Sequence, residues 1–428
     1  MIDYPNKLDI IFDKLNYFNT RPIIIGGYIR DKLLQIPTSK DIDIEVFNIS
    51  SLEKLEEILS QFGSVNSVGK SFGVCKLQLD ELELDFSLPR SDSKTAPGHK
   101  GFTVEHNANL DFKTAASRRD FTINSIGYDV IEKKLLDPFY GQDDLKNKIL
   151  RATDLEKFSE DPLRVLRAVQ FYARFDLKID KKLFVLCKDM IANNILDELS
   201  KERVFQEIKK LLLKSMHPSK GFVLLQELGA FHYFNELENI DEDKWKHTLK
   251  VLDEMAKLKT NDEKTDTVLM LCILCHGFEN SKDKTMTKNF LQKLTNENEL
   301  LQQVINLLEN YNSINALEGK NIEDTNLYKI AQKSNIEKLL LISEAEFLAV
   351  NKNKCFTLGK KIRERAKELD ILNKKAPPLI HGKDLIKLGL EPSKKFSQIL
   401  DDAYMAQING KFNSHEKALK WLKKYLLL

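Results

Sequence analysis

Residues 21–47, RPIIIGGYIRDKLLQIPTSKDIDIEVF, carry the pattern that decides the fold of the N-terminal part of the chain. A short apolar run ends at Gly26 and Gly27, and apolar residues then recur at helical spacing. After Pro37, polar and apolar residues alternate over residues 41–47, as in a half-buried strand. The stretch therefore predicts a strand, a helix and a second strand, with two glycines at the first junction.

The residues that follow extend this pattern into a small sheet with helices. A helical pattern covers residues 52–62, and from about residue 155 the helical period continues almost without interruption. Alternating segments come in two pairs, each joined by a short polar turn: residues 74–79 with 82–88, and residues 125–130 with 135–138. The predicted fold class is α+β, with a small mixed sheet and helices first and an all-helical remainder.

Length and composition limit the class of protein. The chain has 428 residues, of which 42% are hydrophobic and 30% charged, and this excludes disordered and collagen-like chains. No apolar run approaches the roughly 18–20 residues that span a bilayer, and the first residues lack the pattern of a secretory signal. The 5 cysteines, an odd number scattered along the chain, do not indicate a disulfide framework. We expect a cytoplasmic protein with reduced thiols and no membrane contact.

The net charge of +2 conceals a basic C-terminal part. Residues 351–428 hold 18 Lys and Arg against 8 Asp and Glu, a net charge of +10, so the rest of the chain carries −8. Such a segment commonly contacts a polyanion, although a basic helical surface that meets only solvent has the same composition.

Gly26, Gly27 and Arg30 form a candidate phosphate site. Glycines between a strand and a helix let backbone N–H groups approach an anion, and the helix dipole favours phosphate at the start of the helix. Arg30 adds a guanidinium group close by. These residues predict that the junction binds a phosphate.

Asp41, Asp43 and Asp85 form a candidate metal site. Positions i and i+2 of a strand share one face, so Asp41 and Asp43 would lie side by side, and Asp85 on a separate strand would supply a third oxygen. Carboxylate oxygens suit Mg²⁺, and two metal ions about 3.5–4 Å apart support nucleotidyl transfer. A lone Gly-Gly is usually a turn and a lone Asp-x-Asp usually a solvated strand face, but the two together are more specific.

Four motifs in order resemble a known family. Residues 25–34 with residues 41–45 resemble the catalytic signature of class II tRNA nucleotidyltransferases, the CCA-adding enzymes, and of the related bacterial poly(A) polymerases, within the polymerase β-like superfamily. Three later stretches extend the resemblance: RRDFTINS over 118–125, DPFYGQDDL over 137–145 and EDPLRVLRAV over 160–169.

The resemblance implies roles for particular residues of the head. It implies that Gly27 and Arg30 hold a triphosphate, that Asp41 and Asp43 bind Mg²⁺, and that Arg119 contacts the nucleotide. It also implies that Asn124 orients the ribose. Arg118 and Asp120 fit equally well as a structural pair around this turn.

The helix that begins near residue 162 is expected to select the base. In the family, residues matching Asp161 and Arg164 recognise the Watson–Crick edge of the incoming base, so that C and A are accepted while U and G mismatch. Arg167, one turn further, would also reach the nucleotide. Taken alone, Asp161 and Arg164 would more simply be a helix cap and an intrahelical ion pair. Gln170 departs from the family, which usually carries arginine there.

The resemblance implies addition of CCA to the 3′ end of tRNA, with CTP and ATP as substrates and tRNA as partner. Residues 69–74 look like the tRNA-specific members rather than the poly(A) polymerases, and residues 89–107 are long and polar enough to be the flexible loop that distinguishes CCA-adding enzymes. Addition of A alone or of CC alone, a poly(A) polymerase, and a catalytically silent RNA-binding protein stay open as alternatives. The sequence also leaves the oligomeric state open.

The helical half carries weaker motifs. Arg203 and Glu207 match a family motif and are expected to form a structural ion pair that braces the neck. His247, and His276 followed by Gly277, resemble the HD phosphohydrolase domain of some CCA-adding enzymes, but Gly277 stands at the essential aspartate position. We therefore expect a degenerate domain without hydrolytic activity, with phosphomonoester hydrolysis as the open alternative.

The resemblance divides the chain into four expected parts. Residues 379–392 and 399–410 resemble the tail of CCA-adding enzymes, which implies contact with the tRNA stem from acceptor to elbow. The expected parts are a nucleotidyltransferase head over residues 1–150, a helical neck with the base-selecting helix over 151–235, a helical body over 236–372 and a basic, tRNA-binding tail over 373–428.

Overall fold

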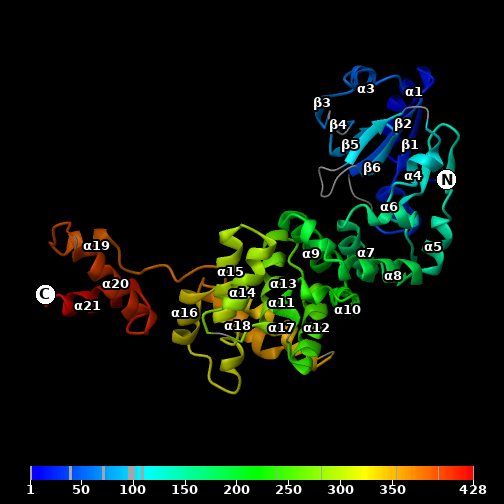
Figure 1. Ribbon diagram of the computed structural model, residues 1–428. Coiled ribbons are helices and arrows are strands. Elements are labelled where there is room, and N and C mark those ends of the chain that lie inside the picture. The colour runs from blue at the N-terminus through cyan, green and yellow to red at the C-terminus, as the bar shows by residue number, and fades with distance from the viewer. Residues whose placement is uncertain are drawn as a thin grey trace. The chain divides into compact units, whose positions relative to one another are not determined.

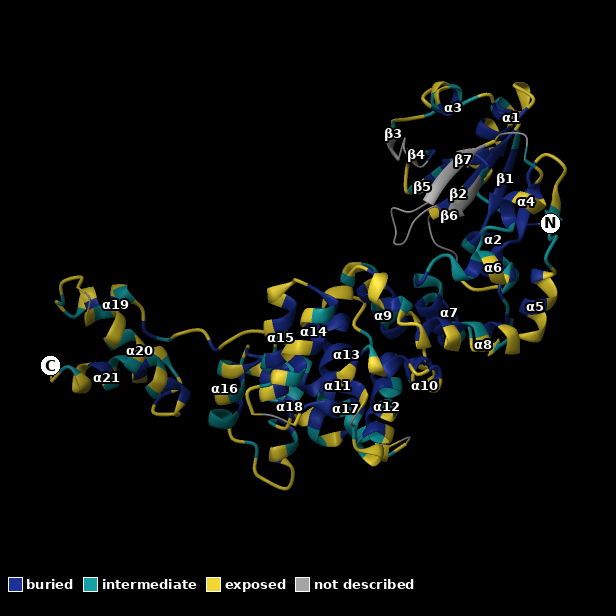
Figure 2. Ribbon diagram, in the orientation of Figure 1, coloured by how far each residue is buried: buried dark blue, intermediate teal, exposed yellow. Residues whose placement is uncertain are grey.

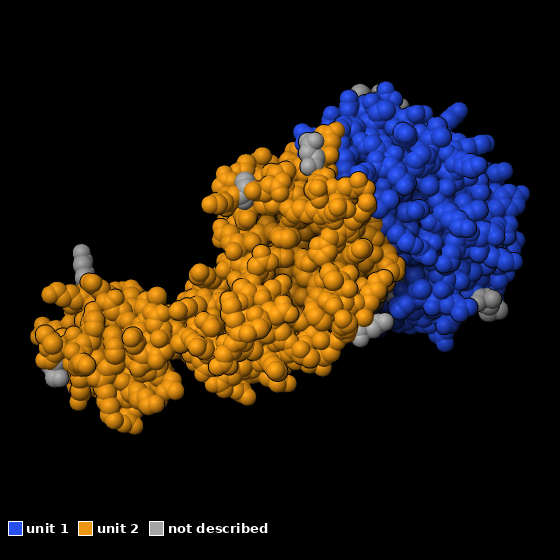
Figure 3. Space-filling view, turned by 90° about the horizontal axis from the view of Figure 1, so that it is seen from below, with its two compact units in different colours: residues 1–215, 220–235 blue, residues 216–219, 236–428 orange. Residues whose placement is uncertain are grey.

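A computed structural model shows two compact units, coloured separately in Figure 3. Unit 1 comprises residues 1–215 and 220–235, and unit 2 comprises residues 216–219 and 236–428. The structure describes residues 2–37, 41–69, 73–94, 102–107, 110–238, 240–280, 282–352, 354–393 and 395–427.

Unit 1 is built on a mixed sheet (Figure 1). The strands of its described part are β1 (Arg21–Ile25), β2 (Asp41–Phe47), β3 (Val65–Gly69), β4 (Val74–Leu79), β5 (Leu82–Ser87), β8 (Gly127–Asp129) and β9 (Lys134–Leu136). Their order across the sheet is β3-β4-β5-β2-β1-β8-β9, in which β2 and β5 run parallel and the other neighbours antiparallel. The strand, helix and strand predicted from residues 21–47 are confirmed, with β1 and β2 as direct neighbours.

The two faces of β2 differ because its residues alternate. Ile42, Ile44 and Val46 are all buried on one face. On the other face, Phe47 packs in a cluster with β1 and with α4 (Phe112–Ala116). Toward the opposite end of the strand, the side chains on this second face change from buried to exposed. The apolar end of β2 thus fixes the strand in the core, and the acidic end reaches the surface.

Helices surround the sheet and continue beyond it. The helices of this part of the chain are η1 (Asn6–Leu8), α1 (Asp9–Tyr17), α2 (Gly27–Leu33), α3 (Leu52–Leu59), α4, η3 (Thr122–Asn124), α5 (Gly141–Asn147), α6 (Leu155–Ser159), α7 (Leu163–Arg174), α8 (Lys181–Ala192), η4 (Ile195–Glu198), α9 (Lys201–Lys214), α10 (Pro218–Glu227) and η5 (Ala230–His232). A short parallel pair joins β10 (Ile149–Leu150) to β11 (Lys178–Ile179). Helices α7 and α9 pack against each other, which brings the expected base-selecting helix beside residues of the next motif.

Two expected segments differ from the prediction. The helix predicted over 52–62 ends at Leu59, where a tight turn follows, and the strand predicted over 125–130 is shorter, because residues 122–124 form a 3-10 turn. Part of the expected loop at 89–107 is an antiparallel pair, β6 (Arg90–Lys94) with β7 (Phe102–His106), while residues 95–101 lie outside the described residues. Residues 70–72, used to separate tRNA-specific members from poly(A) polymerases, also lie outside them.

Unit 2 is helical throughout its described part. Its helices are α11 (Asn235–Glu238), α12 (Glu242–Lys257), α13 (Glu263–Phe278), α14 (Thr285–Leu294), α15 (Asn298–Glu309), η6 (Asn315–Leu317), α16 (Asp324–Lys333), α17 (Ile336–Val350), α18 (Thr357–Glu368), α19 (Gly382–Lys387), α20 (Lys395–Ile408) and α21 (His415–Tyr425). Helix α13 is buried along nearly its whole length (Figure 2), because α12, α15 and α17 pack around it. The last three helices share a separate apolar cluster that includes Leu385, Phe412 and Leu422. In the described part of the chain, no helix is both long and apolar enough to cross a membrane.

The two histidines of the HD-like motif meet in a hydrogen-bonded cluster inside unit 2. His247 Nε2 lies 2.6 Å from Glu346 Oε2, and the hydroxyl of Tyr311 donates to Glu346 Oε1 at 2.5 Å. The ring of His276 stacks on the ring of Tyr311 at 3.7 Å, and burial lowers the pKa of His276 to about 4. Within the described residues, no three His, Cys, Asp or Glu side chains are grouped so as to hold a metal ion.

Gly277 is explained by close packing between α12 and α13. A Cβ at this position would lie 2.6 Å from Thr248 Oγ1 and 3.1 Å from Thr248 Cβ. Any larger residue, the aspartate of an HD motif included, would force the two helices apart.

We predict that Gly277→Ala destabilises unit 2. Overpacking costs about 1–3 kcal/mol, and the better helix propensity of alanine returns about 1 kcal/mol, so the net loss should be about 1 kcal/mol. Thermal unfolding followed by circular dichroism would measure it. Adding Thr248→Ala to the same chain should recover part of the loss, and an unchanged or higher melting temperature for Gly277→Ala alone would contradict the packing explanation.

Candidate functional site

A cavity of about 500 Å³ in unit 1 gathers most of the predicted site residues. It lies where the β1–α2 junction, the segment after α4, the start of α7 and the start of α9 meet. The described residues that line it include six arginines and three aspartates, so the cavity favours an anion. The lining residues are Gly26, Gly27, Arg30, Asp43, Arg118, Arg119, Asp120, Asn124, Asp161, Leu163, Arg164, Arg167, Phe171 and Arg203.

The two glycines bring the backbone close to charged side chains. Gly26 has φ +70°, a left-handed conformation that glycine adopts without strain. A Cβ on Gly26 would lie 3.3 Å from Arg119 Nη1 and 3.6 Å from Asp43 Oδ2, and a Cβ on Gly27 would lie 3.4 Å from Arg30 Nη2. The glycines thus leave the floor of the cavity open between the arginines and the acidic strand.

Arg30 is held at one end of the cavity by hydrogen bonds and aromatic rings. It donates to Asp31 at 2.7 Å and to the side-chain oxygen of Asn124 at 2.7 Å. Its guanidinium lies over the rings of Phe171 and Phe175, 5.2 and 4.6 Å from their centroids. Burial lowers the pKa of Arg30, an effect that Asp31 opposes. Asn124, predicted to orient a ribose, has its amide oxygen engaged in positioning Arg30.

Asp120 is the buried counter-charge of this cavity. It accepts hydrogen bonds from Asn124 at 2.9 Å and from Arg167 at 2.7 Å. Burial alone would raise the pKa of Asp120, but Arg167, Asn124 and Arg164 outweigh it, so the pKa is lowered. Asp120 therefore stays ionised beside the arginines. Arg118 and Asp120, which also fitted a structural pair with each other, have other partners here: Arg118 pairs with Glu45 and Asp120 pairs with Arg167.

Asp161 and Arg164 are each held by groups that sequence spacing did not indicate. Arg203 on α9 donates to both carboxylate oxygens of Asp161, at 3.1 and 3.2 Å, and the backbone N–H of Leu163 donates to one of them at 3.1 Å. Arg164 donates to the carbonyl oxygens of Lys157 at 2.7 Å and Arg118 at 2.6 Å. Both side chains line the same cavity, each with its orientation fixed.

Arg203 and Glu207 were expected to form an ion pair with each other, but each pairs with another residue. Arg203 binds Asp161, as described, while Glu207 accepts from Lys210 at 2.8 Å and lies 4.0 Å from Arg167. Both residues point from α9 toward α7, so their spacing on α9 decides which face they share but not which partner they take. Gln170, the residue that departs from the family, is 2% exposed and is not among the lining residues.

The predicted metal-binding carboxylates lie on one face of the sheet. Asp43 on β2 is the register partner of Asp85 on the parallel strand β5, and Asp41 lies two residues before Asp43. Asp43 and Asp85 line a second cavity of about 220 Å³, and Asp43 borders both cavities. Lys76 donates to both oxygens of Asp85, at 2.8 and 3.1 Å. Asp85 therefore has a protein partner already, and among the described residues Asp41, Asp43 and Asp85 do not form a group of three that could hold a metal ion together.

The electrostatics of Asp43 agree with a site for cations. The pKa of Asp43 is raised, first by the protein that surrounds its carboxylate and then by the nearby Asp85 and Asp41, while Arg119 acts in the opposite direction. A divalent cation would relieve the repulsion among these carboxylates. Oxygen donors on adjacent strands fit Mg²⁺, which typically takes one or two carboxylates and completes its shell with water and substrate phosphates.

Glu45 is the buried residue that sequence reasoning missed. Its side chain is fully buried, Arg118 donates to it at 2.6 Å, and Arg119 Nη2 lies 3.6 Å from its second oxygen. The alternation of Asp41, Asp43 and Glu45 along one strand face was the signal that could have found it.

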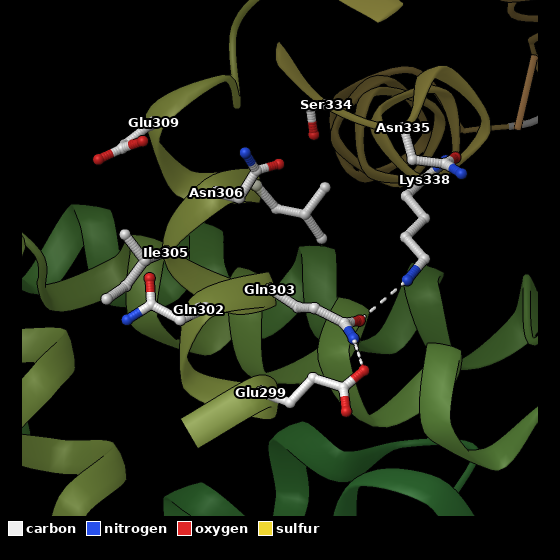
Figure 4. Close-up of a pocket in the computed structure, with 10 residues that line it drawn as sticks. Glu299, Gln302, Gln303, Ile305, Asn306, Glu309, Ser334, Asn335 and Lys338 are labelled. Carbon is white, nitrogen blue, oxygen red and sulfur yellow. Dashed lines mark hydrogen bonds between the residues drawn. The ribbon is translucent and has the colours of Figure 1, made fainter. Parts of the chain in front are cut away.

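A larger cavity, about 640 Å³, lies in unit 2 and has different chemistry (Figure 4). It is lined mainly by α15 and the start of α17. Lys338 donates to Gln303 at 3.2 Å, and Gln303 donates to Glu299 at 3.0 Å, so the charged groups are joined in one chain of hydrogen bonds. Burial lowers the pKa of Lys338. The described lining of this cavity has a single lysine beside Glu299 and Glu309. It therefore offers a polyphosphate far less positive charge than the arginine-lined cavity in unit 1.

Comparison with known families places these sites in context. Residues 23–151 match the "Poly A polymerase head domain", residues 176–241 match the "Probable RNA and SrmB- binding site of polymerase A", and residues 251–422 match "tRNA nucleotidyltransferase domain 2". The three matches follow one another and cover most of the chain. The chain is thus similar to three family models in succession. The predicted α+β fold class is confirmed, because a mixed sheet with helices comes first and helices alone follow. A degenerate HD domain stays a prediction.

Similar curated proteins match about half to three fifths of the chain. The chain is 34% identical over 265 residues to the "Multifunctional CCA protein" of Nitrosococcus oceani, covering 59% of this chain and 61% of that protein. It is 37% identical over 207 residues to the protein of the same name in Chromobacterium violaceum, covering 48% of each. The alignments thus span about half to three fifths of these relatives.

Solved structures share the fold over nearly the whole chain. The CCA-adding enzyme of Bacillus stearothermophilus, in complex with CTP, has a TM-score of 0.76 at 22% identity, covering 99% of this chain and 98% of that one. The CCA-adding enzyme of Thermotoga maritima, complexed with tRNA, has a TM-score of 0.67 at 21% identity, covering 99% and 97%. At these identities the likeness shows the fold alone.

We predict that Asp120→Asn destabilises unit 1 in a pH-dependent way. Removing one partner of a buried ion pair costs about 3 kcal/mol, because Arg167 keeps its charge without compensation. Since the pKa of Asp120 is lowered on folding, its contribution is present above the unfolded pKa of about 3.9 and is lost as the pH falls through the folded pKa. Urea unfolding should show that Asp120→Asn lowers the free energy of unfolding by a constant amount near neutral pH and by a smaller amount below about pH 4. Equal stability of the two proteins at pH 7 would contradict this assignment.

Proposed function

We propose that this protein adds CCA to the 3′ end of tRNA, with CTP and ATP as substrates. The observation that carries the proposal is the arginine-lined cavity that opens beside the carboxylates of β2 and contains Asp161 and Arg164. A site for nucleotidyl transfer needs cationic groups for a triphosphate, acidic groups beside the reacting phosphorus and polar groups for the base. All three lie within one unit of this chain.

The triphosphate is proposed to lie over the β1–α2 junction. Gly26 and Gly27 leave room for phosphate oxygens, while Arg30 and Arg119 supply positive charge on either side. Because both guanidinium groups are held by protein partners, little side-chain freedom would be lost when the nucleotide binds. The α-phosphate would then face the acidic end of β2.

Asp41 and Asp43 are the residues that would hold Mg²⁺, with Asp85 close to them. Bound there, the ion would supply positive charge to the phosphate under attack and to the pyrophosphate that leaves. Among the residues of the chain, Arg119 would orient the phosphate from beside the glycines.

Base choice is proposed to rest on Asp161 and Arg164. A carboxylate accepts a hydrogen bond from the exocyclic amine of C or A, and a guanidinium donates to ring nitrogen or carbonyl acceptors. The anchors on Arg203, Lys157 and Arg118 hold the two groups in one geometry. U and G present the opposite pattern of donors and acceptors at this edge and would leave a buried polar group unpaired.

The helical parts are proposed to hold the tRNA. The Thermotoga maritima enzyme that shares this fold was captured with tRNA. Residues 351–428 carry a net charge of +10, which would attract the phosphates of an RNA stem without reading its sequence. The competing candidates are addition of A alone, addition of CC alone, a poly(A) polymerase and a silent RNA-binding protein.

Extension of defined tRNA ends should separate these candidates. We expect labelled CTP to be added to tRNA lacking three terminal residues, ATP to be added to tRNA lacking one, and growth to stop at a single CCA. Products longer than CCA would indicate a poly(A) polymerase. Restriction to one nucleotide would indicate a CC-adding or A-adding enzyme, and no product with any end would indicate the silent binder.

Asp41→Ala combined with Asp43→Ala should abolish incorporation and leave tRNA binding intact. Removing the metal-holding carboxylates removes the main electrostatic support of the transition state, so the rate should fall at least 10³-fold, on the order of the losses seen when such groups are removed. Rates from single-turnover extension and tRNA affinity from filter binding would measure the two effects. Asp9→Ala combined with Asp13→Ala, two exposed positions of α1, is a matched control for the loss of two negative charges.

A further inference from the structure

Glu45 stands out because it is an acid that the nucleotide chemistry does not require. It lies on the same face of β2 as Asp41 and Asp43, but its side chain has no exposure at all, whereas theirs are exposed. A buried carboxylate is costly unless it is paired. Its position across from Ile23 on β1 and Ser87 on β5 offers no partner from the sheet itself, so its partners come from the segment after α4.

Those partners are two successive arginines. Arg118 Nη2 donates to one oxygen of Glu45 at 2.6 Å, and Arg119 Nη2 lies 3.6 Å from the other oxygen, an ion pair too long for a hydrogen bond. The side chains of Arg118 and Arg119 are only 17% and 13% exposed. Without the charge of Glu45, two adjacent guanidinium groups would be buried side by side and would repel each other.

One of these arginines connects Glu45 to the phosphate end of the cavity. A Cβ on Gly26 would lie 3.3 Å from Arg119 Nη1, so this guanidinium is close to the glycine backbone. Arg119 also interacts electrostatically with Asp43. Glu45 therefore contacts the guanidinium of Arg119 on its buried side. The same guanidinium lies close to Gly26 and Asp43 on its other side.

The other arginine connects Glu45 to the base end. The carbonyl oxygen of Arg118 accepts a hydrogen bond from Arg164 at 2.6 Å. A shift of the backbone at residue 118 would therefore displace Arg164, which lies on α7. The path from Glu45 runs through Arg118 to Arg164 by two hydrogen bonds of 2.6 Å each.

We propose that Glu45 is a positioning residue that fixes the phosphate-binding Arg119 and the base-selecting Arg164 relative to the carboxylates of β2. It acts through Arg118 and Arg119 and touches no substrate itself. The proposal rests on the proposed nucleotidyl transfer. It adds that accuracy of base choice depends on Glu45, a buried charge on the strand that also carries Asp41 and Asp43, which is connected to Arg164 through Arg118.

Glu45→Gln tests the proposal against a matched control. Asp129→Asn is the control, because Asp129 is also fully buried on the same sheet, pairs with an arginine, Arg21, at 2.5 Å, and is absent from the lining of the cavity. Each variant, and the unaltered protein, would be given tRNA lacking its three terminal residues with CTP or with UTP alone. Initial rates at several nucleotide concentrations give kcat and KM, and thermal unfolding gives the stability of each.

We expect Glu45→Gln to raise KM for CTP and to lower kcat/KM by on the order of 10-fold or more, because the groups around the nucleotide lose their alignment. The preference for CTP over UTP should fall as well. Asp129→Asn should lose comparable stability and keep the preference. A preference in Glu45→Gln equal to that of the unaltered protein, or an equal fall in both variants, would overturn the proposal.

Glu45→Asp decides the matter if Glu45→Gln does not fold. It keeps the charge that neutralises the arginines but withdraws it by one methylene, so the variant should fold and still lose base preference. Normal kinetics for Glu45→Asp would overturn the proposal. If the unaltered protein itself incorporates no nucleotide, the proposed function fails instead, and the two failures are thereby distinguished.

Discussion

Charge compensation among buried arginines is the constraint on which the functional part of this structure depends. A cavity that binds a triphosphate needs several guanidinium groups close together, and such groups repel one another when water is removed. The structure meets this constraint with acids that pair with the arginines: Glu45, Asp120 and Asp161 each pair with at least one of them. The arginines that line the cavity still outnumber the aspartates, so the cavity stays positive, while the paired acids reduce the repulsion among the arginines.

The same constraint explains why the acids differ in exposure. Glu45 and Asp120 are buried and serve the arginines, whereas Asp41 and Asp43 are exposed and keep their oxygens available to a ligand. For Asp41, Asp43 and Glu45, a single strand achieves this separation, because the end of β2 that carries Phe47 packs against α4 while the side chains of Asp41 and Asp43 at the other end are exposed. The position of an acid along β2 decides whether its side chain is exposed to a ligand or buried against an arginine.

Close packing plays the corresponding part in unit 2. Helix α13 is buried on all sides, and Gly277 allows α12 to approach it at Thr248. The histidines that resemble an HD motif are held by Glu346 and Tyr311 in hydrogen bonds and a ring stack. Since Gly277 lets the two helices approach closely, a larger residue at this position would conflict with the tight helix contact.

The sequence by itself determined the local features of the protein. Alternation and glycine placement predicted β1, α2 and β2, and the motifs predicted nine of the fourteen described residues that line the cavity, because backbone conformation and residue chemistry are local properties. The tertiary structure alone decided which residues contact each other. Arg118 pairs with Glu45, Arg203 with Asp161 and Lys76 with Asp85, and Gly277 packs against Thr248. These choices join residues distant in the chain, and they depend on strand register and helix packing, which no spacing within a single segment specifies.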